Sequence, residues 1–455
     1  MSVVYDWTAM DRGVEPMEAL LKQLLSHVVQ HGNLSVAMPD GNVTRFGDST
    51  GKPTGFKIHD HSTVLQLLVD PDLYLGEAYT SGQLSVTHGN IYDVLRLLMA
   101  NLETARTPVQ VRLPHAIRRR LKLLQQANRI GQARKNVAHH YDLSGALYDL
   151  FLDNDRQYSC AYFEKTSQSL EHAQLAKKRH LAAKLVIEPE MKVLDIGSGW
   201  GGLGLYLAQI GGAQVTGVTL SKEQHRVSSR RADELGLGGH VGFHLKDYRE
   251  LEGKFDRIVS VGMFEHVGVR HYGELFGKVR ELLAPDGVFV LHSIGRAAGP
   301  GATSAWIRKY IFPGGYCPAL SEVLPEVEKC GLYVTDIEIL RLHYARTLTE
   351  WRNRFAEHRQ QAVDLYDEKF ARMWEFYLAS SELSFRHLGL NNFQLQAAGN
   401  QYALPLTRDY IAREEARLCK IEAKIYVKCR QSGRTKQVVK ATGVESRHYP
   451  QVGKQ

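Results

Sequence analysis

The sequence predicts an α/β protein in which a doubly wound, mostly parallel sheet follows a smaller α+β N-terminal domain. Three observations support this fold. Five short apolar runs with strand character alternate with helical segments between residues 192 and 295. The first run ends in the glycine cluster GSGWGG, which is typical of a tight turn between a buried strand and a helix. A chain of 455 residues is also long enough for two domains.

Composition limits the class of protein. The chain is 44% hydrophobic and 23% charged, and no apolar run approaches the ~18 residues that a membrane span needs. The N-terminus carries Asp6 and Asp11 and lacks the apolar core of a signal peptide. The five cysteines form no CxxC pair, which argues against a disulfide framework or a zinc site. We therefore expect a cytoplasmic protein with reduced thiols and no bound metal.

The N-terminal part has the pattern of a small α+β unit. Residues 16–31 place apolar side chains at helical spacing. The segment LSVAMPDGNVTRFG is typical of a hairpin, with two strands joined by an Asp-Gly turn. Residues 62–100 predict a helix, a loop and a second helix, with YLGEAYTSGQLSV between the two helices. Periodicity alone assigns this unit no function.

A basic stretch follows, from Thr104 to Tyr141. It carries nine Lys and Arg residues and no acidic one, whereas the whole chain has a net charge of +8. The stretch is either a solvated linker helix or a surface for an anionic membrane, where each cation contributes about 1 kcal/mol. Few aromatic residues lie among the cations, so nucleic acid is not expected as a partner. We place a domain boundary here, with an accessory domain over 1–125, a catalytic domain over 126–440 and a disordered tail over 441–455.

The second domain alternates strands and helices. A helix is predicted over 166–186, before the strand that leads into the glycine cluster. Further strands are predicted in AQVTGVTLS, near 240–244, in RIVSVGMF and in VFVLHSIG. Open α/β sheets bind ligands at the carboxyl ends of such strands.

The glycine cluster indicates a nucleotide-sized ligand. Gly197, Gly199 and Gly202 satisfy the dinucleotide pattern, which is weak evidence alone. A dinucleotide site also needs an acidic residue at the end of the second strand, but that strand ends in TLS. Asp195 instead precedes the glycines, and the order DxGxG favours S-adenosylmethionine (SAM) over NAD. A tight turn in some other α/β protein remains the simpler alternative.

Four chemically versatile residues lie in or near the predicted strand ends. Glu265 follows RIVSVGMF, and His292 lies in VFVLHSIG. Cys160 lies in QYSCAYFE and Tyr344 in LHYARTLTEW. Singly, each is more simply a structural residue, and a Cys between aromatics is usually a small buried hydrophobe. Together at one sheet edge, the carboxylate, imidazole and phenol would form a polar cluster with shifted pKa values.

These segments resemble a known family. QYSCAYFE, VLDIGSGWGG, VTGVTLSKEQ, FDRIVSVGMFEHVG, LHSIG, YIFPGG and the Tyr344 segment occur in the same order in cyclopropane-fatty-acyl-phospholipid synthases. Residues 136–430 also resemble mycolic acid cyclopropane synthases and fatty-acyl methyltransferases. The segment LGEAYTSGQLSV resembles the accessory domain of the phospholipid-acting branch. Ser198 stands where family members often carry Cys, and Tyr316 and Cys317 follow PGG where the family varies.

The resemblance implies a SAM-dependent methyltransferase with a Rossmann-like fold. Its reaction would transfer a methylene group from SAM to the cis double bond of an unsaturated acyl chain in a membrane phospholipid. Cofactor contacts are implied for Tyr158, Ser159, Asp195, Gly197, Gly199, Gly201, Thr219, Leu220, Gln224 and Tyr248. A bicarbonate base is implied, held by Cys160, Glu265, His292, Ile294 and Tyr344. Cys160 and Ile294 would contribute mainly backbone amides.

Three other functions stay open at this point. A fatty-acyl methyltransferase of the same fold would leave a methyl or methylene branch instead of a ring. An NAD-dependent oxidoreductase would need the ribose-binding acid that the second strand lacks. A basic lipid- or RNA-binding protein would leave the glycine turn unexplained. The resemblance also implies a homodimer and peripheral association with the inner face of the membrane.

Overall fold

The computed structural model describes residues 8–104 and 144–431, and they form two compact units. The basic stretch after Thr104, the predicted boundary at residue 125 and the tail over 441–455 lie outside the described residues. Across the described ranges, every helix is too short or too polar to span a lipid bilayer.

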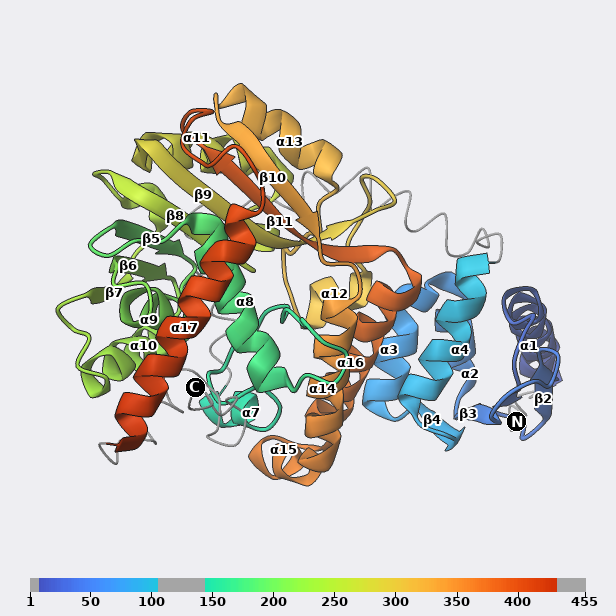
Figure 1. Cartoon of the computed structure of the whole chain (residues 1–455). Coiled ribbons are helices and arrows are strands. Elements are labelled where there is room, and N and C mark those ends of the chain that lie inside the picture. The colour runs from blue at the N-terminus through green and yellow to red at the C-terminus, as the bar shows by residue number, and fades with distance from the viewer. Residues whose placement is uncertain (1–7, 105–143, 432–455) are drawn as a thin grey trace, which may run out of the picture. The chain divides into compact units, whose positions relative to one another are not determined.

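The larger unit is built around a seven-stranded sheet with the strand order β10-β11-β9-β8-β5-β6-β7 (Figure 1). Strands β5 to β9 pair in parallel, and β11 and β10 extend the sheet as an antiparallel edge. The strands are β5 Lys192–Ile196, β6 Gln214–Thr219, β7 Val241–Leu245, β8 Phe255–Val261, β9 Leu283–Arg296, β10 Tyr333–Ile339 and β11 Leu390–Ala398. The doubly wound, mostly parallel sheet is therefore confirmed, and the antiparallel pair is an addition that the sequence did not predict.

Helices cover both faces of this sheet. Successive residues of β5 point to opposite faces, so Val193 joins the core under α8, α9 and α17, and Leu194 joins the core under α11 and α13. The helices of this unit include α7 Gly145–Asp149, α8 Leu170–Leu185, α9 Gly202–Gln209, α10 Lys222–Glu234, α11 Tyr272–Leu282, α13 Leu320–Lys329, α14 His343–Glu357 and α17 Tyr410–Gln431. Both faces of the central strands are buried, which explains their continuous apolar runs.

Helix α8 is buried on nearly every side, and this matters for the site. The sequence predicted a helix over 166–186, and Ser169 caps the observed one by accepting a hydrogen bond from the backbone N–H of His172. Lys177, Lys178 and Lys184 are at most 1% exposed, so three ammonium groups lie inside the unit.

The smaller unit contains residues 8–104 and a four-stranded sheet ordered β2-β1-β3-β4. Its first part comprises α1 Thr8–Val28, β1 Leu34–Ala37, β2 Val43–Phe46, β3 Thr54–Ile58, α2 His61–Val69, α3 Pro71–Ser81, β4 Leu84–His88 and α4 Ile91–Thr104. The predicted β1–β2 hairpin is confirmed, with Gly41 at φ +87° in its turn. The predicted loop between the helices of 62–100 is wrong, because α3, which Pro71 begins, and β4 occupy it.

Two later segments, 301–312 and 355–389, complete the smaller unit. They contribute α12 Ala305–Tyr310, α15 Arg359–Leu365 and α16 Glu368–His387. Tyr79 of α3 donates a hydrogen bond to Glu375 (3.1 Å), and Tyr92 of α4 donates one to Glu382 (3.0 Å). The sequence division at residue 125 separates segments that this unit packs together.

Candidate active site

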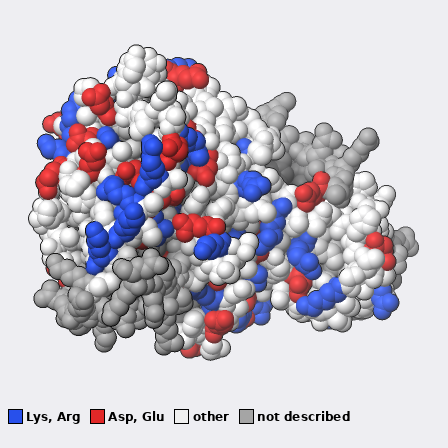
Figure 2. Space-filling view, viewed as in Figure 1, with Lys and Arg blue, Asp and Glu red and all other residues white. Residues whose placement is uncertain are grey.

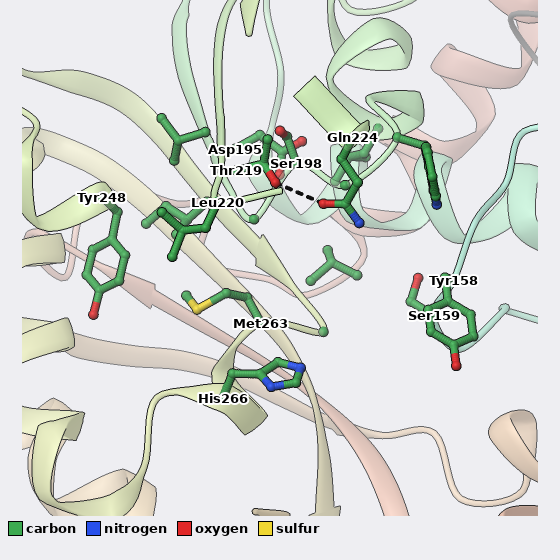
Figure 3. Close-up of a pocket in the computed structure, with 18 of the residues that line it drawn as sticks. Tyr158, Ser159, Asp195, Ser198, Thr219, Leu220, Gln224, Tyr248, Met263 and His266 are labelled. Atoms are coloured by element: carbon green, nitrogen blue, oxygen red, sulfur yellow. Dashed lines mark hydrogen bonds between the residues drawn. The ribbon is translucent and has the colours of Figure 1, made fainter. Parts of the chain in front are cut away.

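A cavity opens at the carboxyl ends of β5, β6 and β8 (Figure 3). Nine of the ten predicted cofactor positions line it: Tyr158, Ser159, Asp195, Gly197, Gly199, Thr219, Leu220, Gln224 and Tyr248. The strands deliver Asp195 and Thr219 to one edge, because the carboxyl ends of parallel strands meet there, and the loop before α8 and the start of α10 add Tyr158, Ser159 and Gln224.

The tenth predicted position, Gly201, lies outside the cavity lining. Its φ of +85° makes it the left-handed residue that precedes α9, and a Cβ there would lie 2.7 Å from Ser228 Cβ and 2.8 Å from Phe243 Cζ. Gly199, by contrast, lines the cavity and has no atom within 4 Å of such a Cβ. One glycine packs the turn against the core, and the other leaves room beside the ligand space.

Polar groups without protein partners face this region. Asp195 is 2% exposed, and its Oδ2 has no hydrogen-bond partner among the described residues; the same holds for the hydroxyl of Ser198. Burial raises the pKa of Asp195 to about 7, and the charge of Lys177 opposes this rise. The Thr219 hydroxyl donates to Gln224 Oε1 (2.8 Å), which fixes the Gln224 side chain and leaves its amide N–H groups for a ligand (Figure 3).

The loop that carries Tyr158 and Ser159 is held by buried charges that sequence reasoning missed. Lys178 donates to Asp155 (2.5 Å), and Arg231 pairs with the same carboxylate and donates to the backbone oxygen of Trp200 (2.7 Å). Asp155 thus ties this loop to α8, to α10 and to the glycine turn.

A sequence signal for a buried cation did exist in α8. Lys177 and Lys184 fall at helical spacing with Leu170, Ala173 and Leu181, the residues that form its apolar side. A lysine at such a position either is buried with the apolar side of the helix or breaks that apolar side, so the pattern indicates a buried ammonium group as one of two outcomes.

Met263 and His266 also line the cavity without having been predicted, and burial lowers the pKa of His266 to about 4.

Three of the five predicted catalytic positions gather around the end of β9. The N–H of Ile294 donates to Glu265 Oε1 (2.7 Å), so this amide is used by the carboxylate itself. Burial raises the pKa of Glu265 to about 7 and holds the pKa of His292 well below its ordinary value. The amide of Gln394 is hydrogen-bonded to His292 Nδ1, with 3.1 Å between Nε2 and Nδ1, and this contact holds the imidazole ring in place. Glu265 Oε2 and His292 Nε2 are buried without a hydrogen-bond partner among the described residues.

Of the other two positions, Tyr344 belongs to α14, and the segment that carries Cys160 contacts this helix. The N–H of Ala161, the residue after Cys160, donates to Thr347 Oγ1 (3.0 Å), and Thr347 follows Tyr344 by about one turn of α14. Tyr344 meets the ring of Trp351 edge-on at 5.9 Å, and Trp351 stacks on the cavity residue Tyr158 at 5.2 Å. Burial raises the pKa of the Cys160 thiol far above its ordinary value, so this residue does not supply a thiolate.

Comparison with known proteins identifies the family. A family profile described as "Mycolic acid cyclopropane synthetase" matches residues 128–395, which is more than half of the chain. The chain belongs to this family. Residues 20–107 match a second profile, described as a domain of unknown function (DUF7884).

Individual relatives and solved structures agree with this assignment. A probable fatty acid methyltransferase of Pseudomonas putida is 41% identical over 61% of this chain and 73% of the relative. The cyclopropane-fatty-acyl-phospholipid synthase of Escherichia coli (strain K12) is 34% identical over 79% of this chain and 94% of the relative. The solved cyclopropane synthase MmaA2 from Mycobacterium tuberculosis has a TM-score of 0.56 and 33% identity, covering 58% of this chain and 98% of that one. The mycolic acid cyclopropane synthase CmaA1, solved with S-adenosylhomocysteine (SAH) and CTAB, has a TM-score of 0.55 and 32% identity, with the same coverages.

The predicted family, fold class and enzymatic nature are therefore confirmed. The protein is a SAM-dependent methyltransferase of the cyclopropane and fatty-acid methyltransferase family. The cavity fits SAM, because it joins open space beside Gly199 to two buried polar groups, on Asp195 and Ser198, that have no partner in the described part of the chain. The NAD-dependent oxidoreductase and the binding protein without catalysis are set aside.

Proposed function

We propose that this enzyme transfers a methylene group from SAM to the cis double bond of an unsaturated acyl chain in a membrane phospholipid and closes a cyclopropane ring. The observation that carries the proposal is the buried pair of titratable groups on Glu265 and His292. Glu265 comes two residues after the cavity-lining Met263, and His292 lies in β9. Similarity to the E. coli synthase, which covers nearly all of that protein, supports the same reading.

The cavity residues hold and orient the methyl donor in this proposal. When bound, SAM supplies an electrophilic methyl group. An alkene is a weak nucleophile, so the two reacting carbons must be held in line and close together. Tyr158 and Ser159 on one side and the Asp195–Gly199 turn on the other fix that position, and Thr219 keeps Gln224 in a single orientation.

The surroundings of the reacting carbons must also be dry. Addition of a methyl group to an alkene leaves a carbocation, which water would convert to an alcohol. Glu265, His292, Cys160 and Tyr344 are each at most 9% exposed, so bulk water has little access to them. Aromatic faces such as that of Tyr344 favour positive charge through their quadrupoles.

Ring closure requires the removal of a proton from the added methyl group. His292 Nε2 and Glu265 Oε2 are both buried without a hydrogen-bond partner among the described residues. A small oxyanion would give each of them a partner when they carry protons. We propose that Cys160, Glu265, His292, Ile294 and Tyr344 hold bicarbonate, which would supply the base. The amide of Ile294 acts in this arrangement by fixing Glu265.

The substrate places the enzyme at a membrane surface. We propose peripheral association with an anionic inner leaflet, and α17 offers cations for it. Figure 2 shows Lys and Arg side chains gathered along α17, where Arg413, Arg417, Lys420 and Lys424 recur at helical spacing. Arg413 and Arg417 pair with acidic residues of the same region.

We also propose a homodimer, for which a solution mass of twice 51.3 kDa would be the evidence.

The test combines product analysis with removal of one candidate group. The enzyme is incubated with SAM and vesicles of cis-unsaturated phospholipid, and the fatty acids are analysed by mass spectrometry. We expect a gain of one CH2 with loss of the double bond. Glu265→Gln should lower the rate at least tenfold and leave SAH affinity unchanged, and Glu281→Gln, an exposed carboxyl on α11 (61% exposed), should match the wild type.

Two further outcomes separate the parts of this proposal. Depletion of dissolved carbonate should slow the reaction and added bicarbonate should restore it; an unchanged rate would refute the bicarbonate base. A branched product that retains one carbon–carbon double bond or carries a methyl group would refute ring closure but keep the methyl transfer.

A further inference from the structure

Lys177 is a buried ammonium group without a carboxylate partner. It lines the cavity and is 1% exposed. Its Nζ donates to Gln157 Oε1 (2.5 Å) and to Ser159 Oγ (2.9 Å), and no carboxylate oxygen of the described residues lies within 4.0 Å of it. Its neighbour Lys178 instead pairs with Asp155, and Lys184 pairs with Glu338 (2.6 Å).

The other cations of the cavity lining are already neutralised or solvated. Arg156 forms two hydrogen bonds of 2.6 Å to Asp149, and Arg249 binds Asp247 through two nitrogens (2.9 and 2.8 Å). Lys246 is exposed. Because a buried charge without a counter-charge is costly, the position of Lys177 calls for an anion that residues 8–104 and 144–431 do not provide.

The hydrogen bonds of Lys177 also determine what its partners can do. An ammonium only donates, so Ser159 Oγ must accept, and the hydroxyl hydrogen is left for another acceptor. Among the described residues no side chain or backbone oxygen accepts it, and Ser159 lines the cavity. Gln157 has no such freedom, because its Nε2 donates to Asp155 Oδ2 (3.0 Å). The Ser159 hydroxyl is thus a donor that Lys177 turns toward the ligand space.

We propose that Lys177 is a positioning residue for the amino-acid end of the cofactor. It orients the Ser159 hydroxyl toward the carboxylate of the cofactor, and its positive charge attracts the same carboxylate. The cavity lining also contains the buried carboxyl of Asp195, so it combines both charge signs, as recognition of a zwitterionic α-amino acid requires. This inference rests on the use of SAM and adds the group that selects one end of that molecule.

A dependence on pH follows from the surroundings of Lys177. Burial lowers the pKa of Lys177 to about 8, and the charges of Asp153 and Asp155 oppose this while that of Lys178 adds to it. Cys160, Asp195 and His292 also lie within electrostatic reach of its ammonium group. Only the protonated lysine attracts a carboxylate, so affinity for a ligand that carries one should fall as the pH rises from 7 to 9.

The experiment uses two ligands that differ only at the amino-acid end. SAH carries the amino acid, and 5′-methylthioadenosine lacks it. Their affinities are measured calorimetrically for the full-length wild type, Lys177→Met, Ser159→Ala and the matched control Lys184→Met. We expect Lys177→Met and Ser159→Ala to weaken SAH at least tenfold and 5′-methylthioadenosine less than twofold. In Lys184→Met, which removes a buried, paired ammonium from the same helix away from the cavity lining, the ratio of the two affinities should equal that of the wild type.

The outcomes decide between a role in recognition and a role in folding. Equal losses for both ligands in Lys177→Met, or an unchanged SAH affinity, would overturn the proposal. If Lys177→Met does not fold, Ser159→Ala and the pH profile of the wild type decide instead. SAH affinity that stays constant from pH 7 to 9 would then refute it. A wild type that binds neither ligand would refute the use of SAM, which is a different failure.

Discussion

Alanine at Gly199 is predicted mainly to weaken ligand binding, and alanine at Gly201 mainly to destabilise the fold. An alanine at position 201 would have to keep the φ of +85° that Gly201 has. Its Cβ would lie 2.7 Å from Ser228 Cβ, in a packed core. The left-handed conformation costs about 1–2 kcal/mol, and overpacking of a core costs about 1–3 kcal/mol. Gly201→Ala should therefore lower the free energy of unfolding by about 2–5 kcal/mol.

At Gly199 only the first of these costs applies. Its φ is +54° and no atom lies within 4 Å of an added Cβ, so we expect a loss of about 1–2 kcal/mol in the free energy of unfolding. The new methyl group enters the cavity, however, and should weaken SAH binding at least tenfold. The folded Gly201→Ala variant should bind SAH within threefold of the wild type, because this residue does not line the cavity.

Guanidinium unfolding followed by circular dichroism, together with SAH calorimetry, measures both quantities. Two results would refute the reasoning. One is a Gly201→Ala variant as stable as Gly199→Ala, since the packing against Ser228 would then be without consequence. The other is wild-type SAH affinity in Gly199→Ala, since the open space beside this residue would then not be ligand space.

Two further predictions concern buried charges. Asp155→Asn should lower the free energy of unfolding by about 3–5 kcal/mol, because it leaves the two cations from α8 and α10 unpaired; a loss under about 1 kcal/mol would contradict the tie between them. Burial lowers the pKa of His180, but hydrogen bonds to Glu338 and Glu415 outweigh it and raise the pKa above 6.5. The protonated His180 therefore adds its full stabilisation to the folded state below about pH 6.5, and this stabilisation is lost as the pH rises through the pKa of His180 in the folded protein. The free energy of unfolding of the wild type should fall over that range, and that of His180→Gln should not. Free energies of unfolding that change equally with pH in both proteins, measured by denaturation from pH 6 to 9, would contradict this.

The parts of the site that could be predicted from the sequence are those set by local patterns. The run before Asp195 is apolar at every buried position, and the glycines that follow have φ values that other residues rarely adopt. A strand, a turn and a helix start follow from such a segment alone. The nine cavity residues that agree with the resemblance lie in this strand and its glycine turn, at the ends of β6 and β7, at the start of α10 and in the loop before α8.

What could not be predicted depends on packing between distant segments. Lys177 and Lys178 are adjacent in sequence, yet one has an ionic partner and the other has none, because Asp155 lies beside only one of them. Gly201 belongs to the same motif as Gly199, but the position of Phe243 on another strand decides which of the two borders the ligand. No local pattern carries this information.

The smaller unit has a consequence for the order of events during synthesis. Tyr79 meets Glu375 across 296 positions, and Tyr92 meets Glu382 across 290. At roughly 10 residues per second, about 30 s pass between the emergence of such partners from a ribosome. Helices α3 and α4 bury part of their surface only against α12 and α16, so the N-terminal segment must wait in an incomplete state while the parallel sheet is made. We therefore expect nascent chains stalled before residue 389 to be cleaved by protease within the first 104 residues, and released full-length chains to resist.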